Sequence, residues 1–391
     1  MRAPALNKRM IISTQSELNA FCAALAKGPY LTIDTEFLRD KTYFPRLCLL
    51  QMAGPDVDAA AIDPLIKDLD WAPVRELMAN QNVIKVFHAA RQDLEIFWNL
   101  YGVLPTPLFD TQVAAMVCGF GEQVAYNALV RELLGNELEK SAQFTDWARR
   151  PLSEKQTRYA LDDVIYLRGV YEKLHTRLVM EKRDHWVMEE MAILANPKTY
   201  QTSPEDSWRR IKIRSDKPEI LAILRHLAAW REQEAISRDV PRGRILKDDT
   251  LADIALFKPR DEDALLQIRS LPNDLARGKV GKKILSLVKE AQSTPRDSWP
   301  KIPRKNGLSK TAQATLEMLK MLLRINCAEQ DVAAKLVAGT DDLERIAAED
   351  NPDIPALRGW RYEMFGRDAI AMKEGKIALL IENGKIVKKP V

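Results

Sequence analysis

Short apolar runs and helical patterns alternate over the first 200 residues of the chain. Strand-like stretches are predicted at residues 30–37, 46–53, 57–62 and 83–88, the last of them a β-branched run typical of a buried strand. Helical patterns are predicted at residues 92–101, 110–118, 126–134 and 153–180. Ser153 and Gln156 form a capping-box signature at the start of the longest helix. Strands first, alternation next and helices last predict an α/β domain with a mixed sheet over residues 1–200.

The remainder of the chain carries helical patterns only, apart from its end. A break at Asn196-Pro197-Lys198 precedes helical periodicity from Lys217 to about Gln292. A proline-rich stretch over 293–303 separates it from a second helical region, which ends in a possible hairpin over 377–387 that turns at Asn383-Gly384. We therefore predict all-α domains at residues 213–292 and 305–391.

Composition agrees with two or three domains in a soluble protein. The 391 residues are 46% hydrophobic and 29% charged, and such a length is too great for one core. No apolar run approaches the roughly 20 residues that cross a bilayer, and the first ten residues lack an export signal. The four cysteines are dispersed and form no C-x-x-C pair, which argues against a zinc site or a disulfide framework. We expect a cytoplasmic protein with no membrane contact.

Charge is unevenly distributed along the chain. Residues 1–200 contain 23 basic and 26 acidic residues, whereas 201–303 contain 21 and 16, and 304–391 contain 15 and 13. An acidic first region followed by a basic middle region suits a catalytic part that gathers carboxylates and a separate part that holds a polyanion. Ordinary variation of the surface is an equally good explanation of differences this small.

The first candidate site is Ile33-Asp34-Thr35-Glu36-Phe37, at the end of a predicted strand. Residues two apart in a strand point to one face, so Asp34 and Glu36 would present two carboxylates side by side. Hard divalent cations such as Mg²⁺ or Mn²⁺ neutralise such a pair. Alone, the pattern fits an exposed strand end with solvated acids better.

Two further segments supply an acid each. Asp93 falls in the first turn of a predicted helix that follows the strand ending near His88, where ligands of α/β folds usually bind. Tyr159 and Asp163 are four residues apart in the longest predicted helix and share one of its faces. Each of these residues alone is better explained by a helix start, by packing or by an exposed surface.

Taken together, the motifs resemble the DEDD exonuclease superfamily in its tyrosine variant. The order is D-x-E on a strand, then an aspartate that opens a helix, then Y-x-x-x-D on a late helix. Three segments are similar to segments of the ribonuclease D family: residues 146–167, the positions from Asp34 through Gln51, and Phe109-Asp110-Thr111-Gln112. The resemblance covers residues 10–200 and implies a ribonuclease H-like exonuclease domain with all the catalytic acids intact.

The resemblance also implies a chemistry. Asp34, Glu36, Asp93 and Asp163 would bind two divalent cations, Mg²⁺ or Mn²⁺, and Tyr159 would orient the attacking water. The reaction would release nucleoside 5′-monophosphates from the 3′ end, and tRNA precursors are the expected substrate. Candidate nucleic-acid contacts in this domain are Phe37, Arg39, Lys41, Tyr43 and His88, although core and surface roles explain each of them as well.

The helical tail resembles the HRDC domain over residues 213–292, on Trp230-Arg231, Asp239-Val240-Pro241 and the run 251–256. The last region is similar to the second HRDC-like domain of the same family. Related modules bind nucleic acid, so Arg242, Arg244 and Lys282 are candidate phosphate contacts. We expect a monomeric exoribonuclease. Two alternatives remain at this point: a 3′→5′ DNA exonuclease with the same metal site, and a non-catalytic nucleic-acid-binding protein on a nuclease fold.

Overall fold

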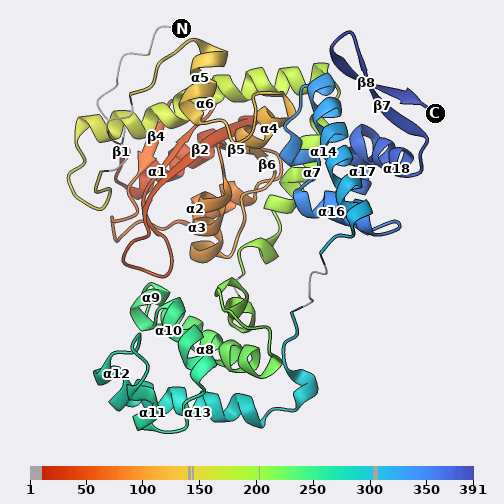
Figure 1. The fold of residues 1–391 in the computed structure, drawn as a ribbon. Coiled ribbons are helices and arrows are strands. Elements are labelled where there is room, and N and C mark those ends of the chain that lie inside the picture. Colours follow the sequence, from red (N-terminus) through yellow and green to blue (C-terminus); the bar gives the residue numbers. More distant parts are fainter. Residues whose placement is uncertain (1–10, 140–141, 143–144, 202, 303–306) are drawn as a thin grey trace. The chain divides into compact units, whose positions relative to one another are not determined.

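The computed structural model describes residues 11–139, 142, 145–201, 203–302 and 307–391 (Figure 1). The described chain forms two units. The first contains residues 11–36, 48–199 and 307–391, and the second contains residues 37–47 together with the described part of 200–302. The expected domain edges at residues 1 and 305 lie outside the described residues.

A six-stranded mixed sheet organises the first unit, in the order β1-β4-β3-β2-β5-β6. β2 and β5, β5 and β6, and β1 and β4 pair in parallel, whereas β3 and β4 pair antiparallel. The strands are β1 (Ile11–Ile12), β2 (Tyr30–Leu38), β3 (Arg46–Ala53), β4 (Ala60–Ile62), β5 (Ile84–Phe87) and β6 (Leu108–Asp110). This confirms the predicted fold class.

The sheet differs from the sequence prediction at its short strands. The strand expected over 57–62 is confined to residues 60–62, because the chain bends just before it and the Gly54 amide donates to the Val57 carbonyl at 3.0 Å. β1 and β6 were not predicted, since strands of two and three residues are too short to show a hydrophobic period.

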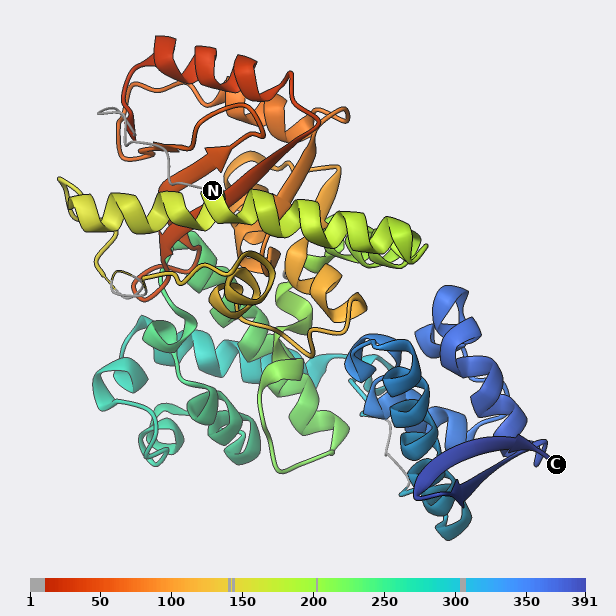
Figure 2. The ribbon, with the colours of Figure 1, turned by 90° about the horizontal axis from the view of Figure 1, so that it is seen from above.

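Helices α1 to α7 surround this sheet. Their bounds are α1 (Gln15–Leu25), α2 (Ala72–Ala79), α3 (Arg91–Tyr101), α4 (Thr111–Val117), α5 (Tyr126–Leu134), α6 (Glu154–Met180) and α7 (Asp184–Leu194). The capping box of Ser153 and Gln156 starts α6, as predicted. α6 contacts β4 and β5 as it runs along the sheet (Figures 1 and 2). The longest helix is therefore the element that carries Tyr159 and Asp163 to the strands.

Residues 307–391 add a helical segment to the first unit. It contains α14 (Lys310–Gln330), α15 (Ala334–Val337), α16 (Thr340–Ala348), α17 (Gly359–Arg361), a π-helical turn (Tyr362–Gly366), α18 (Arg367–Lys373) and the antiparallel hairpin of β7 (Ile377–Glu382) and β8 (Lys385–Pro390). The hairpin turns at Asn383-Gly384, as predicted.

This segment has its own core and also packs on α7. Trp360 and Phe365 are buried in the core. Trp360 stacks on Trp186 of α7 with ring centroids 4.5 Å apart, and Arg361 pairs with Glu190 of the same helix. These contacts attach the segment to the exonuclease part of the chain.

The second unit is all-helical apart from the loop that it takes from the start of the chain. It contains α8 (Pro218–Ser237), α9 (Arg242–Ile245), α10 (Asp248–Phe257), α11 (Glu262–Leu266), α12 (Asn273–Arg277) and α13 (Lys279–Ser293). Leu224, Leu251 and Ile284 lie in its core. None of the helices in the described part of the molecule is long and apolar enough to cross a membrane.

Candidate active site

β2 and α6 bring three carboxylates together. Asp34 and Glu36 are half-buried on β2, while Thr35 between them is buried. Asp163 reaches the same place from α6, and one carboxylate oxygen from each of the three acids lies within 4.8 Å of the others. Acids separated by more than 120 residues therefore meet, as the family resemblance implied.

Two side chains that the sequence analysis did not single out bind the backbone of α6 at this point, one from β2 and one from α5. The Thr32 hydroxyl donates to the Val164 carbonyl at 2.8 Å, and the Tyr126 hydroxyl donates to the Asp163 carbonyl at 2.7 Å. Thr32 had a detectable signal, because it is a polar residue in an apolar run on the same strand face as Asp34. Tyr126 had none, since its role depends on tertiary contact alone.

Asp93 comes from the first turn of α3, as predicted, and is buried. The Thr35 hydroxyl donates to its carboxylate at 2.5 Å. Its oxygens are not among the three that lie within 4.8 Å of one another. Its charge nevertheless contributes to raising the pKa of Glu36, so it belongs to the same electrostatic environment.

Tyr159 lies one helical turn before Asp163 and contacts it. Its ring is 6.1 Å from that of Trp147, a buried residue that packs beside it. Burial and the nearby carboxylates of Asp163, Glu36 and Asp34 raise the pKa of the Tyr159 phenol above its usual range. The hydroxyl therefore stays protonated and can donate a hydrogen bond, and it forms one with Asp163.

Burial and mutual repulsion dominate the electrostatics of the acids. Burial and then the charge of Asp163 raise the pKa of Asp34 well above its usual range. Burial, followed by the charges of Asp34, Asp163 and Asp93, raises the pKa of Glu36 to about 10. Burial raises the pKa of Asp163 to about 7, with a further contribution from Asp162. The negative charge of this cluster of carboxylates must be neutralised by bound protons or by cations.

The donor set fits divalent cations. It consists of oxygen ligands, which Mg²⁺ and Mn²⁺ prefer. Across the described ranges, no lysine or arginine forms an ion pair with Asp34, Glu36, Asp93 or Asp163. A bound cation would supply the positive charge that these side chains do not receive from the rest of the protein.

The residues predicted to contact nucleic acid fall into two groups, those that are engaged or partly buried inside the protein and those that are exposed. Both ring nitrogens of His88 lie near protein groups, Thr111 Oγ1 at 3.0 Å and the Val124 carbonyl at 3.2 Å, and burial lowers the pKa of the ring. The Tyr43 hydroxyl donates to Glu232. Phe37 and Arg242 are half-buried. The exposed candidates are Arg39, Lys41, Arg244 and Lys282.

Comparisons with known proteins agree with this site. A family model described as 3′-5′ exonuclease matches residues 10–179, and the HRDC domain model matches residues 220–288. The ribonuclease D of Nitrobacter hamburgensis is 48% identical over 380 residues, which is 97% of this chain and 98% of that protein. The ribonuclease D of Granulibacter bethesdensis is 47% identical over 379 residues, 97% of this chain and 95% of that protein. The chain belongs to the ribonuclease D family.

A solved structure supports the same assignment. The crystal structure of Escherichia coli RNase D, described as an exoribonuclease involved in structured RNA processing, matches with a TM-score of 0.82 at 28% identity. The match covers 94% of this chain and 99% of that one. The enzyme is thus a 3′→5′ exoribonuclease, a hydrolase that acts on RNA, and carries an HRDC domain. Its fold is one that uses divalent metal ions.

Proposed function

We propose that the enzyme releases nucleoside 5′-monophosphates from RNA 3′ ends by two-metal-ion hydrolysis. Asp34, Glu36, Asp93 and Asp163 would hold the two cations, Mg²⁺ or Mn²⁺. The observation that carries this proposal is the convergence of the Asp34, Glu36 and Asp163 oxygens within 4.8 Å of one another. When bound, such ions neutralise the phosphate and make water a better nucleophile.

The protein residues have separate tasks in this proposal. The four acids would bind the two cations near the end of β2. Tyr159, which stays protonated because burial and the nearby acids raise its pKa, orients the attacking water through its hydroxyl. Thr32 and Tyr126 are positioning residues, because they fix the backbone of α6 next to Asp163 and touch no reacting group.

The substrate part of the proposal concerns precursors of tRNA. An HRDC module in the same chain as an exonuclease domain suits RNA whose folded body is held while its 3′ end is trimmed. We propose that Arg39, Lys41, Arg242, Arg244 and Lys282 contribute phosphate contacts. For His88, Tyr43 and Phe37 we favour structural roles, because contacts inside the protein already engage the first two and Phe37 is half-buried. We further propose that the enzyme acts as a cytoplasmic monomer.

The activity is tested with end-labelled RNA and DNA of one sequence, each with Mg²⁺, with Mn²⁺ and with chelator. We expect nucleoside 5′-monophosphates from RNA only when a divalent cation is present, identified by chromatography. Products that carry a 3′-phosphate would exclude the proposed bond cleavage. Faster degradation of DNA than of RNA would favour a DNA exonuclease instead.

Two further measurements test the number of bound cations and the RNA substrate. A crystal soaked in Mn²⁺ should show two anomalous peaks among the four acids, and a single peak would contradict the two-ion mechanism. A tRNA precursor with a 3′ trailer should be shortened to a defined end. An unstructured RNA of the same length serves as the matched control.

A further inference from the structure

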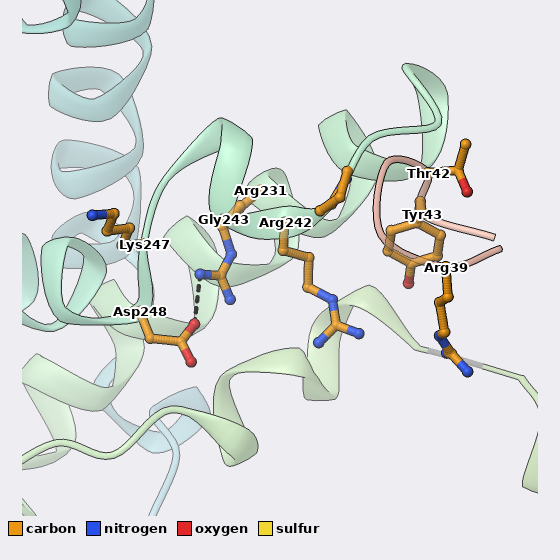
Figure 3. A pocket seen from close by; sticks show the side chains of 9 residues that line it. Arg39, Thr42, Tyr43, Arg231, Arg242, Gly243, Lys247 and Asp248 are labelled. Carbon is orange, nitrogen blue, oxygen red and sulfur yellow. Dashed lines mark hydrogen bonds and ion pairs between the residues drawn. The ribbon is translucent and has the colours of Figure 1, made fainter. Parts of the chain in front are cut away.

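The second unit contains a pocket whose wall comes from two distant stretches of chain. Its volume is about 450 Å³, within the range of about 300–1,000 Å³ typical of ligand sites. One wall is the loop between β2 and β3, and the other is formed by α8, α9 and the start of α10 (Figure 3). The lining includes Arg39, Tyr43, Arg231, Arg242, Lys247 and Asp248.

Several interactions fix the loop wall of the pocket. The Asp239 carboxylate accepts hydrogen bonds from the backbone amides of Tyr43 at 3.0 Å and Phe44 at 3.1 Å. The Tyr43 hydroxyl donates to Glu232, which is fully buried. The Arg242 guanidinium lies 5.6 Å from the centroid of the Tyr43 ring. The pocket is thus built in advance of any ligand.

The lining contains more basic than acidic side chains. Four of the lining side chains, Arg39, Arg231, Arg242 and Lys247, carry positive charge, and Asp248 alone carries negative charge. Asp248 is paired with Arg231 at 2.6 Å, and Arg242 is also within 3.4 Å of the buried Glu232. In the part of the chain that the structure describes, the Lys247 ammonium has no ion pair or hydrogen bond. A net excess of positive charge remains.

Arg231 supplies an independent sign of a missing acceptor. It is only 2% exposed, donates to the Leu246 carbonyl at 3.0 Å and pairs with Asp248. Its Nε is buried and lacks a hydrogen-bond partner among the described residues. Buried N–H groups of charged side chains are nearly always paired, so the Arg231 guanidinium beside the pocket has a donor that the described residues leave unengaged.

We propose that this pocket binds a phosphate group of a ribonucleotide, with Arg231, Arg242 and Lys247 as its main partners. The inference rests on the proposed function, since it names a second phosphate subsite for the same substrate. Two sources share this chemistry: a phosphodiester of the RNA chain and the phosphate of a released nucleoside 5′-monophosphate. Arginine forks and a lysine ammonium suit both.

Gly243 allows a direct test. It is exposed at the pocket, and a Cβ placed on it meets nothing within 4 Å, so a longer side chain fits. Gly243→Glu adds negative charge, and Gly243→Gln is its neutral match. In the full chain with chelator, we expect RNA to bind roughly tenfold more weakly to the Glu variant than to the Gln variant, because like charges repel at these distances. Fluorescence anisotropy of a labelled oligoribonucleotide measures the ratio.

Salt dependence gives a second, matched comparison. Lys247 and Lys289 are both exposed, and neither ammonium group is paired with another described residue. Only Lys247 lines the pocket. Lys247→Gln should reduce the slope of log affinity against log salt by about 0.7–0.9, the value of one phosphate contact. Lys289→Gln should leave the slope unchanged.

Adding 5′-AMP in chelator separates the two sources of phosphate. If the pocket takes the product, 5′-AMP displaces RNA from the wild type and less effectively from the Gly243→Glu variant. If it takes the chain, 5′-AMP does not displace RNA, and the Glu variant still binds RNA more weakly. Equal affinity of the Glu and Gln variants for both ligands would overturn the subsite. Failure of the wild type to hydrolyse RNA with Mg²⁺ would instead overturn the proposed function.

Discussion

Carboxylates that are half-buried or fully buried occur in both units, in opposite electrostatic surroundings. In the first unit, Asp34, Glu36 and Asp163 face one another, and no lysine or arginine of the described chain pairs with them. In the second unit, Glu232 is fully buried but accepts from Tyr43 and lies 3.4 Å from both Arg210 and Arg242. A buried acid that the chain itself neutralises is structural. Acids that it leaves unneutralised create a site for an external cation.

The largest effect is expected for Asp163→Asn. The variant keeps the shape of the side chain but removes one charge from the cation site. The rate of hydrolysis should fall about a thousandfold or more, because a bound cation is worth several kcal/mol of transition-state stabilisation and about 1.36 kcal/mol is a factor of ten. Single-turnover cleavage of labelled RNA measures it.

Asp162→Asn is the matched control for that change. Asp162 is the adjacent acid, and its oxygens are not in the converging set. We expect its rate to stay within a few-fold of the wild type. A near-normal rate for Asp163→Asn would remove Asp163 from the metal site and erase the contrast between the two units.

Tyr159→Phe should have the next largest effect. It removes the hydroxyl that we assign to orienting water and leaves the acids in place. Loss of a hydrogen bond to a charged or reacting group should lower kcat by roughly 10–100-fold, with little change in RNA affinity. Tyr171→Phe, in the same helix and packed on Tyr30 with ring centroids 4.6 Å apart, is the control. An unchanged kcat for Tyr159→Phe would show that the hydroxyl takes no part.

Glu232→Gln tests the other side of the comparison. The change leaves Arg210 and Arg242 without their buried partner and weakens the acceptor for Tyr43. The free energy of unfolding should fall by about 1–3 kcal/mol, measured by denaturant titration. Glu234→Gln, which removes an ion pair with Arg238 at the helix surface, should cost less than about 0.5 kcal/mol. Equal losses of unfolding free energy in the two variants would mean that the buried contacts of Glu232 stabilise the second unit no more than a surface ion pair does.

The smallest effect concerns pH and metal removal. The folded-state pKa of Asp163 is about 7 and that of Glu36 about 10, both above their unfolded values. Their contribution to stability is therefore present at low pH and is lost as pH rises through the folded-state pKa values. In chelator, Tm should decrease between pH 5 and pH 8, by about 2–4 °C for each 1 kcal/mol of stability that is lost.

Two changes should flatten that slope. Saturating Mg²⁺ should do so because the cation replaces the protons, and Asp163→Asn should reduce the slope in chelator because one titrating acid is gone. A slope in chelator that neither change affects would place the pH dependence outside the acid cluster.

The sequence was most informative where the chemistry is local. Asp34 and Glu36 are two apart on a strand, and Tyr159 and Asp163 are four apart on a helix, so spacing alone indicates shared faces. The resemblance supplied the order that joins these pairs with Asp93. The capping box at Ser153 marked the start of α6.

The remaining features depend on tertiary contacts, which local sequence patterns do not predict. Tyr126 reaches Asp163 from another helix, and the loop 37–47 lies in the second unit although its sequence belongs to the exonuclease region. The stacking of Trp360 on Trp186, which joins the last segment to α7, likewise depends on residues 174 positions apart. No hydrophobic period predicts such pairs.

The loop over residues 37–47 also limits how the enzyme can be taken apart. It begins with the last two residues of β2 and ends with the first two of β3, yet its partners Glu232, Asp239 and Arg242 belong to the helical unit. A fragment that ends near residue 200 would leave this loop without its support, and the helical unit expressed alone would lack one wall of its cationic pocket. A chimaera that exchanges the HRDC module between two relatives therefore has to transplant the loop along with it.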